Sequence, residues 1–292
     1  MMLTVRHLKN CIGLAVALLM AGAGAARAAD EFRFVLLGDR TGEAVTGVYE
    51  QLWKQIAGEN PRFVITTGDS IQGLNDAAAE SQWREFLKIL TPYAKLPFYT
   101  AAGNHDVWSA ASEQLYTRFT KRPLRYSFDS AQLHVTVLDN SRSDEMPKED
   151  LAFWAADLKA HAGRPLKIMV SHRPSWLINI AMRNSDYALH KLAKQYGVQY
   201  VIAGHVHQML HLELDGVTYL SLPSAGGHLR LSGAYDDGWF FGYTLVTVRG
   251  NQVEMQVKEA AAPHGEGRVS KISDWGMNGL MNKPAGAASS GK

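Results

Sequence analysis

The sequence FRFVLLGD, residues 32–39, is an apolar run ending in Gly-Asp, and it predicts a buried strand that opens into a loop. An amphipathic helix is predicted next, because apolar side chains recur at helical spacings within residues 45–56. Asn60-Pro61 stops the helix, and FVITTGD, residues 63–69, predicts a second strand with the same ending. Strand, helix and strand at this spacing indicate a parallel pair with a crossover, and therefore an α/β fold.

The rest of the chain repeats this pattern and then changes to antiparallel strands. Helices are predicted near residues 82–90, 110–119, 151–161 and 188–196. Strands are predicted near residues 98–101, 126, 134–138, 166–170 and 199–202, and antiparallel ones within 210–222 and 240–257. We predict one domain, residues 29–260, with mixed sheets flanked by helices. Residues 261–292 lack periodicity, so we expect a largely irregular tail in which Trp275 and Met277 could dock.

Residues 1–28 have the composition of a secretory signal peptide. Arg6 and Lys9 precede an uncharged apolar run at residues 11–23, and Ala26-Arg27-Ala28 offers an A-x-A cleavage site. A membrane anchor is the alternative, but the run is shorter than the roughly 20 residues that a spanning helix needs. We therefore expect a periplasmic or secreted protein with no stable membrane anchor after cleavage near Ala28.

The leader also accounts for the charge balance of the chain. It carries three basic residues and no acid, so its removal would lower the formal net charge of +2 by three. A nearly neutral mature chain gives no electrostatic argument for binding nucleic acid or an anionic membrane. Cys11 is the single cysteine of the sequence, so the mature chain would depend on its core and on any bound metal rather than on a disulfide.

Polar residues that can bind a metal ion follow five of the predicted strands. In α/β folds the carboxyl ends of the strands border the crevice that binds ligands, so these side chains are expected to converge. Carboxylate, amide oxygen and imidazole suit ions such as Mn, Fe or Zn, and a carboxylate can bridge two ions about 3.5–4 Å apart. The predicted metal ligands are Asp39, Asp69, Asn104, His172, His205 and His207.

Five motifs in a fixed order carry a resemblance to a known family. In sequence they are Gly38-Asp39, Gly68-Asp69, Gly103-Asn104-His105-Asp106, Ser171-His172 and Gly204-His205-Val206-His207. They resemble the motifs of the calcineurin-like metallophosphoesterases, which include purple acid phosphatases and many bacterial phosphodiesterases. The resemblance implies an αββα sandwich, two packed mixed β-sheets flanked by helices. Gly-Asp alone is a weak signal, whereas GNHD and GHVH, each after a predicted strand, are specific.

The resemblance implies a role for each matched residue. Asp69 would bridge two ions, and Asp39 and His207 would hold the first of them. The second site would be completed by Asn104, His172 and His205.

Three further residues of the motifs bear on catalysis. His105 resembles the family residue that contacts the phosphate and assists the leaving group, with Asp106 orienting its ring. Thr41 stands where the family has a histidine ligand, and because a hydroxyl is a poor ligand, the first site is expected to be weaker. Arg40 is a candidate contact for a substrate phosphate, because a guanidinium matches phosphate geometry; pairing with a neighbouring carboxylate is the alternative.

Each of these residues also has an ordinary interpretation. An aspartate after glycine commonly caps a turn or a helix. The two histidines of GHVH could be a solvated pair at a strand end, and His105 could be a structural histidine bonded to Asp106. The order of the motifs along the chain favours the metal site over these readings.

The sequence therefore predicts metal-dependent hydrolysis of a phosphomonoester or phosphodiester by a metal-activated hydroxide. The cofactor would be one or two divalent or trivalent ions of Mn, Fe or Zn, and the partner a small-molecule phosphoester. The alternative is a catalytically weak or inactive metal-bound binding protein whose first site has degraded at Thr41. The intact pair His105-Asp106 favours the enzyme, and the sequence leaves monoester and diester substrates, and the oligomeric state, open.

Overall fold

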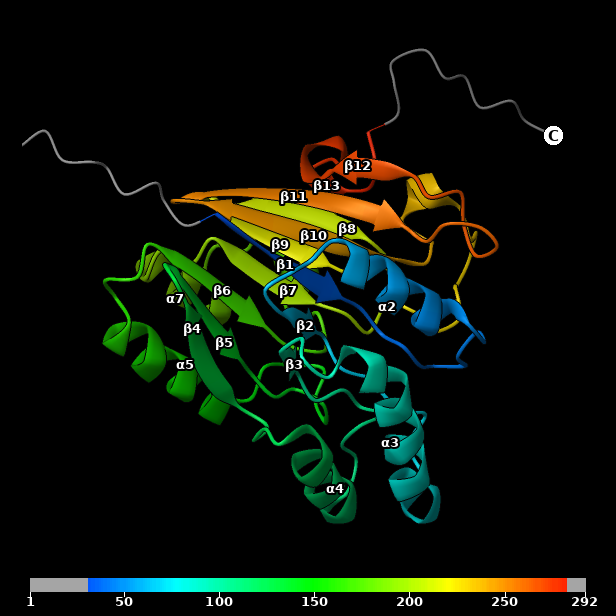
Figure 1. Ribbon diagram of the computed structural model, residues 1–292. Coiled ribbons are helices and arrows are strands. Elements are labelled where there is room, and N and C mark those ends of the chain that lie inside the picture. Colours follow the sequence, from blue (N-terminus) through cyan, green and yellow to red (C-terminus); the bar gives the residue numbers. More distant parts are fainter. Residues whose placement is uncertain (1–30, 283–292) are drawn as a thin grey trace, which may run out of the picture.

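The fold consists of two β-sheets packed face to face, seen in a computed structural model that describes residues 31–282 (Figure 1). Within these residues one sheet has six strands, in the order β12 (Val269–Lys271), β11 (Gln252–Glu259), β10 (Gly242–Arg249), β1 (Phe32–Leu37), β2 (Val64–Thr66) and β3 (Phe98–Thr100). The other has seven, in the order β13 (Asn278–Gly279), β8 (Leu210–Leu214), β9 (Val217–Ser221), β7 (Tyr200–Ala203), β6 (Leu166–Val170), β5 (Leu133–Val137) and β4 (Tyr126–Ser130).

Both sheets are mixed, with a parallel centre and antiparallel margins. Strands β1, β2 and β3 are parallel to one another, as are β5, β6, β7 and β9. Strands β10, β11 and β12 extend the first group by successive antiparallel pairs, and β4, β8 and β13 join the second sheet by antiparallel pairing with their neighbours. The predicted α/β class, with two packed mixed sheets, is confirmed. The parallel groups place the carboxyl ends of their strands where ligand sites form.

Helices cover the outer face of each sheet (Figure 1). Helices α2 (Val48–Gly58), α3 (Asp76–Leu90) and α4 (Ala110–Thr120) share a hydrophobic cluster with the first sheet. Helices α5 (Lys148–Ala160), α6 (Leu177–Ala181) and α7 (Ala188–Gln195) share one with the second. Short 3₁₀ turns complete the described elements at η1 (Thr91–Tyr93), η2 (Tyr235–Asp237) and η3 (Ile272–Asp274).

Strand β1 shows why the central strands have continuous apolar sequences. Phe34 and Leu36 point into the core between the sheets, whereas Val35 and Leu37 pack against the helical layer. All four side chains are fully buried. Burial on both faces is typical of parallel strands under helices, and it removes the polar alternation of a half-exposed strand.

The segment after residue 260 differs from the irregular tail that we predicted. Strand β12 pairs antiparallel with β11 and extends the first sheet. Trp275 is buried. Its Nε1 donates to Ser270 Oγ at 3.0 Å, and its carbonyl oxygen accepts from His211 Nδ1 at 2.6 Å. Met277 is exposed, so only the tryptophan docks. The described fold therefore extends past residue 260 through β12 and β13, which are three and two residues long and too short to show periodicity.

Two sequence predictions concern the ends of the chain. The predicted signal peptide, residues 1–28, and the last ten residues lie outside the described range. Between residues 31 and 282, no helix combines the length and the apolar composition needed to cross a bilayer.

A buried histidine connects β4, β5 and α5 at the end of the second sheet away from its parallel carboxyl ends. His134 Nδ1 lies 2.8 Å from Asp129 Oδ1, and its Nε2 lies 2.8 Å from Asp157 Oδ2. Burial alone would lower the pKa of His134, but the hydrogen bonds to Asp157 and Asp129 outweigh it and raise that pKa above its usual value. Because a carboxylate oxygen faces each ring nitrogen, the geometry suits the protonated ring, which then forms a charged link between strand and helix.

We predict that His134→Gln lowers the free energy of unfolding by about 2 kcal/mol at pH 6, because two carboxylates lose their charged donor. Since the folded pKa is raised, this stabilisation is fully present below the unfolded pKa of about 6.5 and is lost as the pH rises through the folded pKa. Urea unfolding of both proteins from pH 5.5 to 9 measures the difference, which should shrink as the pH rises. His228→Gln, at an exposed ring, is the control; a wild-type to His134→Gln difference that is constant across pH would contradict the charged link.

Candidate metal centre

The six predicted metal ligands all lie just beyond the carboxyl ends of parallel strands. Asp39 follows β1, Asp69 follows β2 and Asn104 follows β3 in the first sheet. In the second sheet His172 follows β6, and the GHVH motif follows β7. Both sheets therefore contribute side chains to one edge of the sandwich, as the strand pattern predicted.

Four of these residues form a compact group around the ring of His172. Its Nε2 lies 2.9 Å from Asn104 Oδ1, 3.1 Å from His205 Nδ1 and 3.4 Å from Asp69 Oδ2. Ligand atoms of Asp69, His172 and His205 all lie within 4.8 Å of one another. The structure thus brings together the complete set that the resemblance assigned to the second metal site.

The histidines are held in the tautomer that a metal ligand needs. His172 Nδ1 lies 2.8 Å from the carbonyl of Thr67, and His207 Nδ1 lies 2.9 Å from the carbonyl of His228. A carbonyl can only accept, so each Nδ1 carries the hydrogen and each Nε2 presents its lone pair to the site. Lone pairs of nitrogen and oxygen that converge in this way are what a cation would satisfy, so the residues fit a bound metal ion.

The first site is less complete. His207 Nε2 lies 3.4 Å from Asp39 Oδ2, so the two residues assigned to this site are adjacent. Thr41, where the family has histidine, is buried and donates from its hydroxyl to Gln72 Oε1 at 2.6 Å. The hydroxyl hydrogen of Thr41 is thus directed at the side-chain amide of Gln72. The residues that would hold a first ion are therefore Asp39 and His207, with Asp69 as the carboxylate that the resemblance assigns to both sites.

The backbone of the site is strained at three ligands and closely packed at two glycines. Asp69, His205 and His207 have φ of 52°, 67° and 59°, in the left-handed region, which typically costs about 1 kcal/mol or more for a residue with a side chain. A Cβ at Gly103 would lie 2.1 Å from Asp69 Oδ1, and one at Gly204 would lie 2.2 Å from Asp39 Oδ1. The glycines of GNHD and GHVH therefore let the chain approach the carboxylates.

Burial and mutual repulsion set the charges of the site. Burial would raise the pKa of Asp39, but its polar neighbours His172, His207 and the backbone N–H of His205 prevail and lower it to about 2. Burial, reinforced by the charge of Asp39, raises the pKa of Asp69 to about 7. Burial also lowers the pKa of His172, and that of His205 to about 3, so both rings are neutral ligands. Two adjacent buried carboxylates with neutral imidazoles form a donor set that a Mn, Fe or Zn ion stabilises.

His105 is anchored differently from the sequence prediction. Its ring Nδ1 lies 2.5 Å from the carbonyl oxygen of Gln72, so Nδ1 carries the hydrogen and Nε2 remains available. Its backbone N–H donates to Asp69 Oδ1 at 2.9 Å, which places the residue directly beside the metal ligands. The carbonyl of Gln72, and not Asp106, orients the ring.

Asp106 instead braces the loops that carry the ligands. It is fully buried and accepts backbone N–H bonds from Gly103 at 3.0 Å, Ser70 at 2.8 Å and Ile71 at 3.3 Å. These bonds join the loop after β3 to the loop after β2. Asp106 thus makes its hydrogen bonds to backbone N–H groups and not to the ring of His105, and its carboxylate positions the loop that contains Asp69.

Arg40 packs against neighbouring elements beside the site, and its contact with a substrate phosphate stays a prediction. Its Nη1 donates to the carbonyl of Ser70 at 2.9 Å. The guanidinium lies over the rings of Tyr49 and Phe86, at 5.7 and 5.9 Å from their centroids. These contacts engage the side chain with helices α2 and α3, and its partners are a backbone carbonyl and aromatic rings rather than the carboxylate of the alternative prediction.

Asn140 is a site residue that the sequence reasoning missed. Its Oδ1 accepts from the backbone N–H of His172 at 3.1 Å and of Arg173 at 3.0 Å, and its Nδ2 donates to the carbonyl of Arg173 at 2.8 Å. Asn140 follows β5 by three residues, so the rule that selected polar residues after strands could have found it.

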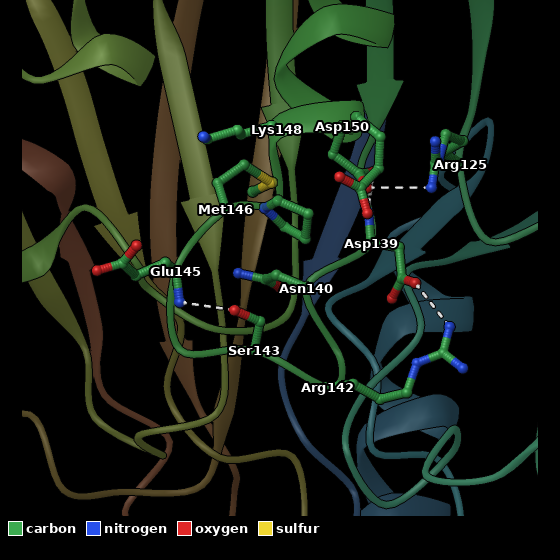
Figure 2. Close-up of a pocket in the computed structure, with 11 residues that line it drawn as sticks. Arg125, Asp139, Asn140, Arg142, Ser143, Glu145, Met146, Lys148 and Asp150 are labelled. Atoms are coloured by element: carbon green, nitrogen blue, oxygen red, sulfur yellow. Dashed lines mark hydrogen bonds and ion pairs between the residues drawn. The ribbon is translucent and has the colours of Figure 1, made fainter.

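A polar cavity of about 530 Å³ lies against this segment (Figure 2). Asn140 lines it, together with the ion pairs of Arg125 with Asp150, at 3.3 Å, and of Arg142 with Asp139, at 3.6 Å. One wall of the cavity is thus the residue that holds the backbone of His172.

This fold and this site define a metal-binding protein of the phosphoesterase type, and comparisons with known proteins agree. The Calcineurin-like phosphoesterase family matches residues 32–209, which include all six ligands. The chain belongs to this family.

Individual relatives are distant. The 3',5'-cyclic adenosine monophosphate phosphodiesterase CpdA of Escherichia coli (strain K12) is 27% identical over 200 residues, 65% of this chain and 69% of the relative. Tartrate-resistant acid phosphatase type 5 of Rattus norvegicus is 26% identical over 312 residues, 86% of this chain and 93% of the relative. The structure of purple acid phosphatase PPD1 from yellow lupin has a TM-score of 0.62 at 18% identity, covering 83% of this chain and 53% of that one, which shows a shared fold. The chain spans about half the length of the lupin protein.

We predict that Asp69→Asn weakens metal binding by about 100-fold or more, because it removes the carboxylate shared by both sites. The metal content of purified protein equilibrated with Mn²⁺ and dialysed, measured by inductively coupled plasma mass spectrometry, tests this. Asp186→Asn, at an exposed carboxylate paired with Lys191, is the matched control and should retain the wild-type content. A folded Asp69→Asn protein with unchanged metal content would show that Asp69 is not a ligand.

Proposed function

We propose that this protein hydrolyses phosphoesters with the help of bound metal ions. The observation that carries the proposal is the group of Asp69, Asn104, His172 and His205, with His105 bonded beside it. Relatives named as a cyclic nucleotide phosphodiesterase and as an acid phosphatase support the reaction class. They leave both monoesters and diesters as substrate classes.

Bound metal ions supply Lewis-acid stabilisation of the phosphoryl oxygens and lower the pKa of water, which provides the nucleophile. The ligand residues hold this chemistry at the strand ends, and the backbone bond from His105 to Asp69 fixes the distance between the ligands and the catalytic ring. Because Gln72 accepts from Nδ1, a protonated His105 can donate from Nε2 to the departing oxygen. The ring then becomes neutral without changing its anchor.

We predict that the Mn²⁺-loaded protein cleaves 4-nitrophenyl phosphate or bis(4-nitrophenyl) phosphate, and that His105→Ala lowers kcat by about 100-fold. If His105 protonates the leaving group, the loss should be larger for an alkyl phosphate, whose leaving oxygen is more basic. Steady-state assays with both kinds of substrate, at equal metal content, measure the effect.

His161→Ala, at a half-buried ring beside His134, is the control for removing an imidazole. Absence of turnover on both ester classes with Mn, Fe and Zn would refute the proposed reaction. Equal kcat for wild type and His105→Ala would refute the role of the histidine alone.

A second candidate function, a metal-bound binding protein, is favoured by one observation. Thr41 donates to Gln72 where the family has a metal ligand, so the first site has fewer donors than the second. Metal counting distinguishes the two functions. A single tightly bound ion and no turnover would favour a binding protein, whereas two ions, with or without phosphate present, would favour the enzyme.

A further inference from the structure

Two arginines outside the predicted set lie beside His205. Arg173 Nη1 is 3.4 Å from His205 Nε2, the ring nitrogen that does not face His172. Arg230 Nη2 is 3.4 Å from the backbone carbonyl of His205. Two guanidinium groups, from segments almost sixty positions apart in the sequence, therefore meet at one ligand of the metal centre.

The backbone of Arg173 is fixed by hydrogen bonds, whereas its guanidinium pairs with an exposed carboxylate. Asn140 bonds its backbone N–H and carbonyl, and its Nε donates to the carbonyl of Ser141 at 3.3 Å. Its Nη1 pairs with the carboxylate of Asp144, a side chain that is 89% exposed. An ion pair with so exposed a partner contributes little, so an anion entering the site could take over this guanidinium at small cost.

Arg230 brings a charge that nearby acids do not offset. It lies in the exposed segment between β9 and β10, beyond residue 209, where the family match ends. Its guanidinium donates to the neutral carbonyl of His205, and no carboxylate of residues 31–282 lies within ion-pair distance of it. The net charge of the arginine pair at the site is therefore positive.

We propose that Arg173 and Arg230 bind the phosphoryl group of the substrate and make the site select phosphomonoester dianions over phosphodiester monoanions. This inference rests on the proposed function for its choice of phosphoester as ligand. A guanidinium is always charged and binds two phosphate oxygens at once, so it recognises an oxygen that carries no second ester group. A phosphodiester monoanion has one negative charge fewer and one non-bridging oxygen fewer than a phosphomonoester dianion.

A purely structural role for Arg173 gives a different expectation. If the arginine only ties the segment after β6 to the loop at residues 139–147, then Asp144→Asn should disturb the site as Arg173→Gln does. If Arg173 binds the phosphoryl group, Asp144→Asn removes a competing anion, and phosphate binding should stay the same or become tighter.

The test is isothermal titration calorimetry of the full-length Mn²⁺-loaded protein with inorganic phosphate, methyl phosphate and dimethyl phosphate at pH 8. Wild type should bind methyl phosphate at least about tenfold more tightly than dimethyl phosphate. Arg173→Gln and Arg230→Gln should each weaken methyl phosphate binding by about tenfold and leave dimethyl phosphate within about threefold. Arg84→Gln, at an exposed arginine of α3 paired with Glu80, is the control and should match wild type. Metal content is measured on every variant, so that a lost ion is not read as a lost phosphate contact.

Three outcomes would overturn the inference: equal affinity of wild type for the two esters, no detectable binding of methyl phosphate, or wild-type affinity in both arginine variants at full metal content. Asp144→Asn with the same loss as Arg173→Gln would assign Arg173 a structural role and overturn its part. Failure of the proposed function is separate, because it would appear as absent hydrolysis of both aryl esters while phosphate binding and its dependence on the arginines persist.

Discussion

The structure depends on burying two neighbouring carboxylates, Asp39 and Asp69, at the meeting edge of two sheets. Each is held by a backbone N–H of a distant segment: His205 donates to Asp39 at 2.9 and 3.1 Å, and His105 donates to Asp69 at 2.9 Å. The first bond joins β1 to the loop after β7, and thus one sheet to the other. An ionised carboxylate in the interior needs such donors or a cation, so the same demand that builds the metal site also locks the sandwich.

This constraint explains where the chain accepts unfavourable local geometry. Asp69, His205 and His207 adopt left-handed backbone conformations, and the glycines before Asn104 and His205 lie within contact distance of the carboxylates. Such strain is tolerated where the surrounding packing over-determines the conformation. Here the well-packed cores on both sides of β1 provide that packing, so hydrophobic burial far from the site stabilises its strained loops.

The parts of the fold that the sequence predicted correctly are those specified by short-range patterns. Strands β1 and β6 begin and end where predicted, because continuous apolar runs with a polar stop define them. Helix α3 begins at Asp76, several residues before its predicted start, because the Asn75 side chain caps it. Helix α6 was not predicted because it has only five residues.

For the site, the ends of the predicted strands identified the metal ligands. The direction of a side chain after a strand, however, depends on tertiary contacts. Asp106 therefore bonds backbone loops instead of the ring of His105, Arg40 contacts Ser70 and an aromatic ring, and Asn140 was missed.

Gln72 connects Thr41, the residue that departs from the family, to His105, the proposed proton donor. Its side-chain oxygen accepts from Thr41 and from the backbone N–H of Glu43, while its carbonyl accepts from the ring of His105. Gln72 thus accepts from the hydroxyl of Thr41, at the position where the family has a metal ligand. It also sets the tautomer of the His105 ring beside Asp69. Thr41 and the ring of His105 are therefore linked through a single residue, which offers a path of hydrogen bonds between the loop that contains residue 41 and His105.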